Sequence, residues 1–328
     1  MTSPSVSHLP APIARADNTA LASEPLIERA RAYTEAAVPP NTLRAYAASW
    51  RSFAVFCDSR DEESLPAAPQ TVALYVAHRA ELCTVSTVRQ NLAAIASKHA
   101  ENGLESPCKH EVVRRMFRGI ARTKGTVPRR KDAITIDPLR AMLLEIRGEG
   151  LKAERDRALL LLGFSAALRR SELAAINFED LAFCKEGLRL TIPRSKTDQT
   201  GEGAVIAVPY VPNRSLCAVR ALRSWLEASG ITSGPVFRSF TLRRELTDRA
   251  VDGGAIAELI QTLARKAHLD GNYAGHSLRA GFATSAARAK VSLDSIARTT
   301  RHKSLTVLMG YVRPAQAFDD VALTSMIV

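Results

Sequence analysis

The sequence predicts a mainly α-helical protein of two domains, in which the second domain also carries a small antiparallel β-sheet. Three observations predict this class. The chain of 328 residues is longer than one domain of ordinary size. Apolar residues recur at helical spacing over most of its length, and strand-like alternation is confined to residues 188–211. A composition of 46% hydrophobic and 24% charged residues is that of a soluble, folded protein.

The first domain is predicted over residues 24–122 as a string of helices. Residues 1–23 are rich in Pro and Ser, which is typical of a disordered tail, and they lack the basic start and apolar core of a signal peptide. Asn41 is expected to cap the second helix, and Ser86 or Thr87 the fourth. The helices are expected at residues 24–38, 41–60, 67–81, 85–103 and 108–123.

A basic linker is predicted at residues 123–134, between the two domains. The run from 109 to 131 holds nine Lys and Arg residues against Glu111 alone. Within this run, KGTVPRRKD has the composition of a linker. A basic linker in this position could cross a phosphate backbone.

The second domain is predicted over residues 135–328. Asp137 as N-cap and Pro138 at the first helical position open its first helix, and helical signals continue through residues 154–176. Two strands, at 188–193 and 204–211, flank a polar turn. Further helices are expected at residues 216–230, 255–269, 275–289, 292–300 and 301–314.

The charge and the cysteines limit the kinds of partner and compartment. A net charge of +12 and a pI near 9.8 favour a polyanion such as nucleic acid over a small neutral substrate. The five cysteines are scattered without a CxxC pair, as in reduced cytosolic proteins. The longest apolar run, at 158–164, is far shorter than the ~20 residues that span a bilayer. We therefore expect a cytoplasmic protein with no membrane partner.

Several polar residues of the second domain stand where a helix pattern does not require them. His276 and Arg279 are three apart in a predicted helix, so both side chains leave the same face. The set consists of Arg169, Lys196, His276, Arg279, His302 and Tyr311.

Each of these residues also has an ordinary structural explanation. Arg169 could form a surface pair at a helix end, Lys196 could be an exposed turn residue, and the HSLR segment could be a polar helix face. Tyr311 could be a core residue, because it lies in a stretch with apolar residues at helical spacing. That stripe consists of Leu305, Leu308 and Val312.

Together, however, the set is chemically complete for attack on a phosphodiester. That reaction needs a nucleophile, positive donors for the non-bridging oxygens and a proton source for the departing oxygen. Two arginines supply planar charged donors. A tyrosine hydroxyl is a weak nucleophile whose proton a neighbouring histidine can take, and a lysine can protonate the leaving group.

The sequence lacks the signatures of other enzymes that act on phosphate groups. It contains no carboxylate cluster or Cys/His set for a metal, no HExxH and no GxxxxGK[ST] loop. We therefore expect a reaction that uses neither a metal ion nor ATP, and no cofactor.

Four features resemble the signature of the tyrosine recombinases, also called the phage integrase family. In order along the chain they are ALRRSEL, a lysine in a β-hairpin turn, HSLR and RHxxxxxxxxY. The resemblance covers the chain from about residue 24 to its end. It implies a helical, SAM-like core-binding domain at 24–122 and a catalytic domain at 135–328, which clamp DNA from two sides. The two-domain plan is most similar to the Cre-like branch of the family.

The resemblance also implies a role for each site residue. Tyr311 would attack a scissile phosphate and form a 3′-phosphotyrosyl bond, releasing a 5′-hydroxyl. Arg169 and Arg279 would hold the phosphate, while Lys196 would protonate the leaving oxygen. His276 would assist proton transfer. The phosphate would also accept a hydrogen bond from His302, and an acidic residue, Glu172, would support the site.

The implied partner is double-stranded DNA with an inverted-repeat site, on which four copies would exchange strands through a Holliday junction. The tail at 315–328 would dock into a neighbouring subunit, and accessory proteins are a further partner class. The resemblance favours a bacterial, phage or plasmid origin. DNA contacts are expected from the second and fourth helices and the linker, at Arg44, Arg51, Thr87, Arg89, Gln90, Lys98, Arg129, Arg130 and Lys131.

Two departures and two alternatives accompany this interpretation. TRH stands where many members have LGH, and HSLRAG where many have HxLRH, but neither removes a catalytic group. A type IB topoisomerase uses a similar residue set, although the five-helix first domain and short tail favour recombination. A DNA-binding protein without catalysis would not need the full set. The target sequence, and whether the reaction integrates, excises or resolves DNA, stay open.

Overall fold

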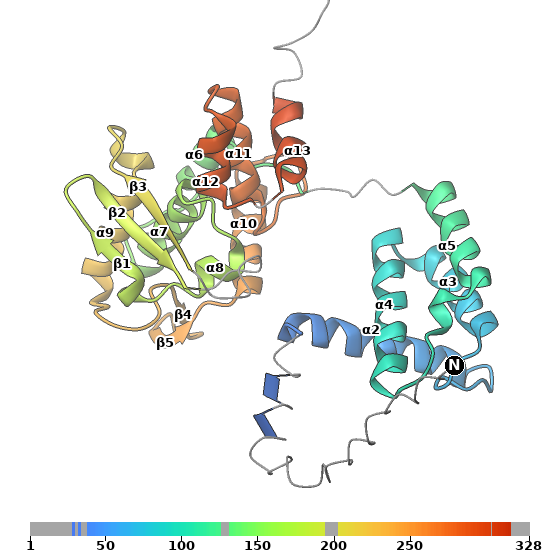
Figure 1. Cartoon of the computed structure of the whole chain (residues 1–328). Helices are drawn as coiled ribbons and strands as arrows, with labels where there is room; N and C mark the ends of the chain where they lie inside the picture. The colour runs from blue at the N-terminus through green and yellow to red at the C-terminus, as the bar shows by residue number, and fades with distance from the viewer. Residues whose placement is uncertain are drawn as a thin grey trace, which may run out of the picture. The chain divides into compact units, whose positions relative to one another are not determined.

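The computed structural model describes residues 28–29, 32–33, 38–125, 131–193, 203–302 and 304–315. The chain divides into two compact units, one up to Arg129 and the other from Arg130 onward, and each is described by itself (Figure 1). The predicted tail at 1–23, most of the first predicted helix and the end of the chain from 316 lie outside the described residues.

The first unit is built from helices that pack in crossed pairs. Its core joins α2 and α4, and α3 and α5. Phe53 and Tyr75 meet edge to face at its centre, with ring centroids 5.1 Å apart, and Ile95 and Val113 close the core from α4 and α5. A short 3₁₀ turn, Pro107–Lys109, precedes α5. The four helices are α2 (Pro40–Asp58), α3 (Pro69–Leu82), α4 (Val85–Glu101) and α5 (Glu111–Lys124).

The helix starts differ from the predicted caps. In α2, Pro40 takes the first helical position, so Asn41 lies inside the helix and accepts a hydrogen bond from Arg44 instead of capping. In α4, Thr84 is the N-cap and accepts from the Thr87 amide, so the predicted caps at 86 and 87 are wrong. The helix predicted to begin at Pro138 begins two residues earlier, at Ile136, with Thr135 instead of Asp137 as its N-cap.

The second unit holds a three-stranded antiparallel sheet of order β1-β2-β3, a separate β4-β5 hairpin and eight α-helices among its described residues. Figure 1 shows α11, α12 and α13 grouped beside α6. Its helices are α6 (Ile136–Leu144), α7 (Leu151–Ser165), α8 (Arg170–Ala174), α9 (Ala218–Ser229), α10 (Gly253–Lys266), α11 (Ser277–Arg288), α12 (Leu293–Thr300) and α13 (Leu305–Ala315).

The structure confirms the predicted pair of strands and contains three strands that the sequence did not predict. Strands β2 (Gly187–Ile192) and β3 (Ala204–Pro209) pair with Leu190 opposite Ile206. Alternate side chains of β2 are buried, as a half-covered sheet requires. The predicted polar turn between them lies mostly outside the described residues. The strands that the sequence did not predict are β1 (Leu181–Phe183), β4 (Arg238–Phe240) and β5 (Leu246–Ala250).

The helical run expected at residues 154–176 is interrupted. Helix α7 ends at Ser165 and α8 begins at Arg170. Between them Ala167 takes a φ of +48°, a left-handed conformation that ends the helical ladder. The break exposes the carbonyl oxygens of Ala166 and Ala167 to side chains from elsewhere, and both accept hydrogen bonds from arginines of the site.

Helix α11 lies unusually close to the segment that precedes α6. The amide of Ile134 donates to the carbonyl of Ser277 at 3.0 Å. A Cβ atom placed on Gly281 would lie 1.8 Å from the carbonyl oxygen of Ile134, a backbone atom that cannot rotate away. Only a glycine permits this approach, which holds the start of α11 in place.

We predict that Gly281→Ala destabilises the second unit by about 2 kcal/mol, because the added methyl group must push two backbone segments apart. Calorimetric unfolding of the full chain measures this. Gly119→Ala is the matched control: Gly119 lies in α5 with open space around its Cβ position, so alanine is expected to stabilise by about 0.5–1 kcal/mol. An unchanged unfolding temperature for Gly281→Ala would contradict the prediction.

Candidate active site

Five of the six predicted catalytic residues lie in the described residues, and the fold gathers them at the ends of α8, α11 and α12 and within α13. Arg169 is the N-cap of α8, His276 the N-cap of α11, and Arg279 lies in the first turn of α11. His302 follows α12, and Tyr311 lies in α13. The sixth residue, Lys196, belongs to the 194–202 segment outside the described residues.

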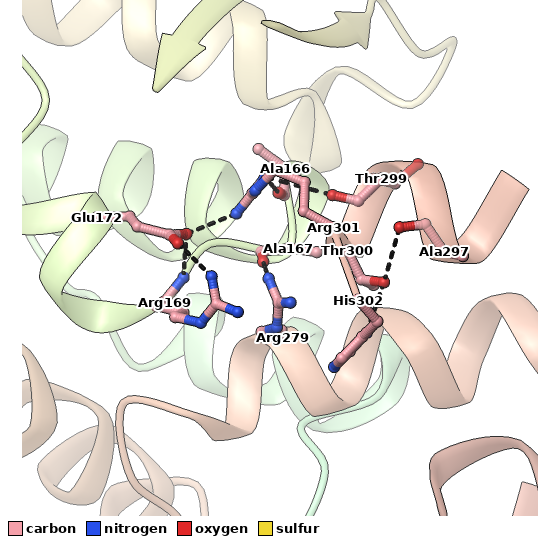
Figure 2. A network of polar contacts seen from close by, with 10 residues as sticks. All are labelled: Ala166, Ala167, Arg169, Glu172, Arg279, Ala297, Thr299, Thr300, Arg301 and His302. Carbon is pink, nitrogen blue, oxygen red and sulfur yellow. Dashed lines mark hydrogen bonds and ion pairs between the residues drawn. The ribbon is translucent and has the colours of Figure 1, made fainter. Parts of the chain in front are cut away.

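Glu172 organises the arginines of the site (Figure 2). Its Oε1 accepts from the Arg169 guanidinium at 2.5 Å, and its Oε2 accepts from the Arg169 backbone amide at 2.9 Å. Oε2 also accepts from Arg301 at 2.5 Å. Burial raises the pKa of Glu172, but the charge of Arg301 and the bonds from Arg169 outweigh it, so the pKa is lowered and the carboxylate stays ionised.

Arg279 is buried, with 1% of its surface exposed. One amino group donates to the Ala167 carbonyl at 2.8 Å, while its Nε and other amino group have no hydrogen-bond partner in the described part of the chain. Burial and repulsion from Arg169 and Arg301 lower its pKa to about 9, so it is still charged at neutral pH. A buried cation with unsatisfied donors is a site for an anion.

His302 is held in one tautomer by Thr300. The single hydroxyl proton of Thr300 is donated to the Ile296 carbonyl at 2.6 Å, so its oxygen accepts from Nδ1–H of His302 at 2.7 Å. Burial, then the charges of Arg279 and Arg169, lower the pKa of His302 from 6.5 to about 4. At neutral pH the ring is therefore neutral, with Nε2 as an acceptor.

Tyr311 lies between the apolar core and the polar site. Its hydroxyl is 3.1 Å from Nε2 of the exposed His276, and its ring centroid lies 5.9 Å from that of His302. The ring also packs against the cluster that contains the buried Leu308 and Val312. The stripe predicted from helical spacing is only partly core, because Leu305 is 59% exposed.

The site carries excess positive charge. Three guanidinium groups, of Arg169, Arg279 and Arg301, lie around the one carboxylate of Glu172, and His302 is neutral. The arrangement leaves two positive charges for an anion, with a hydroxyl and an imidazole beside them. Among the described residues, no group of three or more His, Cys, Asp or Glu side chains could hold a metal ion.

Sequence reasoning gave Arg301 no role, although its contact with Glu172 places it in the site. The available signal was the TRH tripeptide, which puts an arginine where many family members have the glycine of LGH. Arg301 adopts a φ of +54°, the left-handed region that a glycine enters freely. Because an arginine is unfavourable in that conformation, its presence could have been used to predict a role for the Arg301 side chain.

The predicted DNA contacts lie on two helices of the first unit. Arg44, Arg51, Arg89 and Gln90 are exposed. Gln90 of α4 donates to Ser49 of α2 at 3.3 Å, which ties the two helices together. Thr87 and Lys98 are partly buried on α4, Lys131 is exposed and bonds to Asn272, and Arg129 and Arg130 lie outside the described residues.

Comparisons with known proteins show the family of the chain. The family model described as "Phage integrase family" matches residues 133–317. The "Integrase/recombinase xerD homolog" of Selenomonas ruminantium is 38% identical over 308 residues, 93% of this chain and 90% of that protein. The "Recombinase cre" of Escherichia phage P1 is 26% identical over 287 residues, covering 80% and 81% of the two chains.

Solved structures share the fold. A lambda integrase dimer bound to a COC′ core site gives a TM-score of 0.61 at 14% identity, covering 88% of this chain and 93% of that one. XerH recombinase bound to palindromic difH substrate gives 0.55 at 15% identity, covering 79% and 71%. At these identities the likeness concerns the mainly helical fold with its small antiparallel sheets, which the sequence predicted.

The family model and these relatives define an enzyme of DNA strand cleavage and rejoining. The chain belongs to the phage integrase family and is a tyrosine recombinase. No helix within the described ranges is long and apolar enough to cross a membrane.

We predict that His302 titrates near pH 4 in the free protein, because burial and two arginine charges disfavour its protonated form and lower its pKa. The measurement is an NMR titration of the histidine ring signals, assigned by loss of one signal in His302→Gln. Arg169→Gln removes one of the charges and is expected to raise the pKa. Titration of His302 close to 6.5 in the wild type would contradict the electrostatic account.

Proposed function

We propose that the chain is a site-specific recombinase that cuts DNA through a covalent 3′-phosphotyrosyl link at Tyr311 and exchanges strands through a Holliday junction. The observation that carries the proposal is one contact: the Tyr311 hydroxyl lies 3.1 Å from His276. The buried Arg279, with donors left for an anion, belongs to the same site. A nucleophile, a proton acceptor and a phosphate-binding cation are thereby combined.

The strand-cleavage step is a transesterification. The Tyr311 oxygen attacks phosphorus, a new P–O bond forms to tyrosine, and the bond to the 5′ oxygen breaks. The tyrosine proton passes to His276, and Lys196 protonates the departing oxygen, a role implied by the family resemblance. One phosphodiester bond replaces another, so the reverse attack by a 5′-hydroxyl reseals DNA without ATP.

The arginines would stabilise the pentavalent transition state. Arg169 and Arg279 would each donate to non-bridging oxygens, and removal of one such preorganised donor typically costs about 100–1,000-fold in rate. A phosphate in the site would also cancel part of the field that keeps His302 neutral. Its pKa would then rise, and the protonated ring could donate from Nε2 to the phosphate.

The first unit and the linker would supply most of the DNA affinity. The net charge of +12 supports binding to double-stranded DNA. We assign residues 24–122 to core binding, 123–134 to a basic linker and 135–328 to catalysis. Four copies would assemble on an inverted-repeat site, helped in some reactions by accessory proteins. The enzyme would act in the cytoplasm.

The proposal predicts covalent protein–DNA adducts in cells that express the wild type beside a genomic or plasmid library from the source. After denaturation, sequencing of the DNA that stays attached is expected to give a few defined loci. Tyr311→Phe is the matched control, because it keeps the ring that packs on Leu308 and removes only the hydroxyl. Adducts are expected to be lost in this variant.

Two results would oppose the proposal. Adducts in equal amount from Tyr311→Phe would show another nucleophile. Adducts scattered over all DNA would favour relaxation by a topoisomerase-like enzyme over site-specific recombination.

The tetramer proposal makes its own prediction. A chain that ends after Pro314 keeps Tyr311 but lacks the tail proposed to dock into a neighbour. It is expected to bind one half-site and to form adducts, while recombination and synaptic tetramers fall by at least about tenfold, because the subunit contact is lost. Gel mobility and in vitro recombination assays check this. Normal tetramers from the truncated chain would show that the tail is not needed for assembly.

A further inference from the structure

Arg301 contacts two parts of the site, the α7–α8 break and the end of α12 (Figure 2). One amino group donates to Oε2 of Glu172 at 2.5 Å. The other reaches the carbonyl oxygens of Ala166 at 3.4 Å and Thr299 at 3.3 Å. The side chain therefore ties the α7–α8 break, which presents Arg169, to the end of α12, which presents His302.

The backbone of Arg301 is strained for this placement. Its φ of +54° is a left-handed conformation that disfavours any residue with a Cβ. Its side chain is also 11% exposed, so the charge has been taken largely out of water. Both costs are avoided by a glycine, and an observed backbone outlier in a site is grounds for a functional hypothesis.

The two carboxylate oxygens of Glu172 are shared between two arginines. Oε1 accepts from the Arg169 guanidinium, while Oε2 is shared between the Arg169 amide and Arg301. Arg301 and the Arg169 amide therefore both hold the carboxylate that binds the Arg169 guanidinium. Arg301 thus acts on the phosphate-binding group through Glu172.

We propose that Arg301 is a positioning residue for strand cleavage, which clamps Glu172 and thereby holds the Arg169 guanidinium and the His302 segment in register. This inference rests on the proposed function of the site. It concerns a residue that lies outside the recombinase pattern of Arg, Lys, His-x-x-Arg, His and Tyr.

Removal of Arg301 has a consequence that depends on pH. The charged groups that face Glu172 are Arg169 at the start of α8, Arg301 after α12 and Arg279 in α11. Burial raises the pKa of Glu172, and Arg301 is the largest influence that lowers it. Without Arg301 the carboxyl group takes up a proton at higher pH, and once neutral it holds Arg169 less well.

The test uses Arg301→Gly, which relieves the backbone strain, and Arg301→Lys, which keeps the charge but loses the planar contacts. The substrate is a duplex that carries one locus recovered from the covalent adducts, at saturating concentration. Arg301→Gly is expected to form adducts at least about tenfold more slowly at neutral pH. As the pH is lowered, its rate should fall further than that of the wild type, while Arg301→Lys is expected to follow the wild-type profile.

Two further variants separate positioning from general damage. Arg298→Ala removes an exposed cation from the same helix and is expected to cleave within about twofold of the wild type. Because Arg301 acts through Glu172, adding Arg301→Gly to Glu172→Gln should slow cleavage no further. The inference is wrong if Arg301→Gly cleaves at the wild-type rate. It is also wrong if Arg301→Gly slows cleavage by the same factor at every pH, and by the same factor in the wild type and in Glu172→Gln.

A measurement without DNA tests the clamp independently of cleavage. Titration of the ¹³C-labelled glutamate carboxylates, with Glu172 assigned by its loss in Glu172→Gln, should show a higher pKa in Arg301→Gly than in the wild type. Identical titrations would also overturn the inference. A wild type that forms no Tyr311 adduct while this shift is present would count against the proposed function and leave the clamp intact.

Discussion

The concentration of buried positive charge around Glu172 is the constraint on which the rest of the site depends. Moving an arginine out of water costs several kcal/mol, and one carboxylate cannot compensate three of them. Some of the remaining donors bind backbone carbonyls that a regular helix would have used itself, while Nε and one amino group of Arg279 have no partner among the described residues. The break between α7 and α8 supplies two of these carbonyls, at Ala166 and Ala167. The break in the helix therefore provides part of the cationic site, because its free carbonyl oxygens bind the arginines.

The same field governs the protonation of His302. An imidazolium beside two arginines is disfavoured, so the free site keeps His302 neutral and directs its acceptor nitrogen away from Thr300. In the proposed mechanism, a phosphate group would cancel part of this field. Substrate binding and protonation of His302 would then be linked, and His302 would become a phosphate donor only when a phosphate is bound.

The sequence predicted the long helices and the β2–β3 pair because their hydrophobic periods are strong and local. It missed the α7–α8 break because the AALRRSEL segment consists of good helix formers without Gly or Pro. The left-handed Ala167 closes a local cap, in which the Leu168 amide donates to the Gly163 carbonyl and the Ala167 amide to the Phe164 carbonyl, and its own carbonyl accepts from Arg279, 112 residues away. Arg301 was missed for a related reason, since a left-handed position is expected to hold glycine.

Tyr311 shows why helical spacing could not decide between a core role and a chemical one. Its neighbours Leu308 and Val312 are buried against α11 and α12, which fixes the rotation of α13. That rotation leaves the Tyr311 ring at the margin of the cluster, with its hydroxyl at His276, the N-cap of α11. The close approach of Gly281 to Ile134 holds α11 itself. The apolar stripe thus directs the Tyr311 hydroxyl toward His276, so the packing of the ring and the proposed chemistry of the hydroxyl both depend on the same pattern.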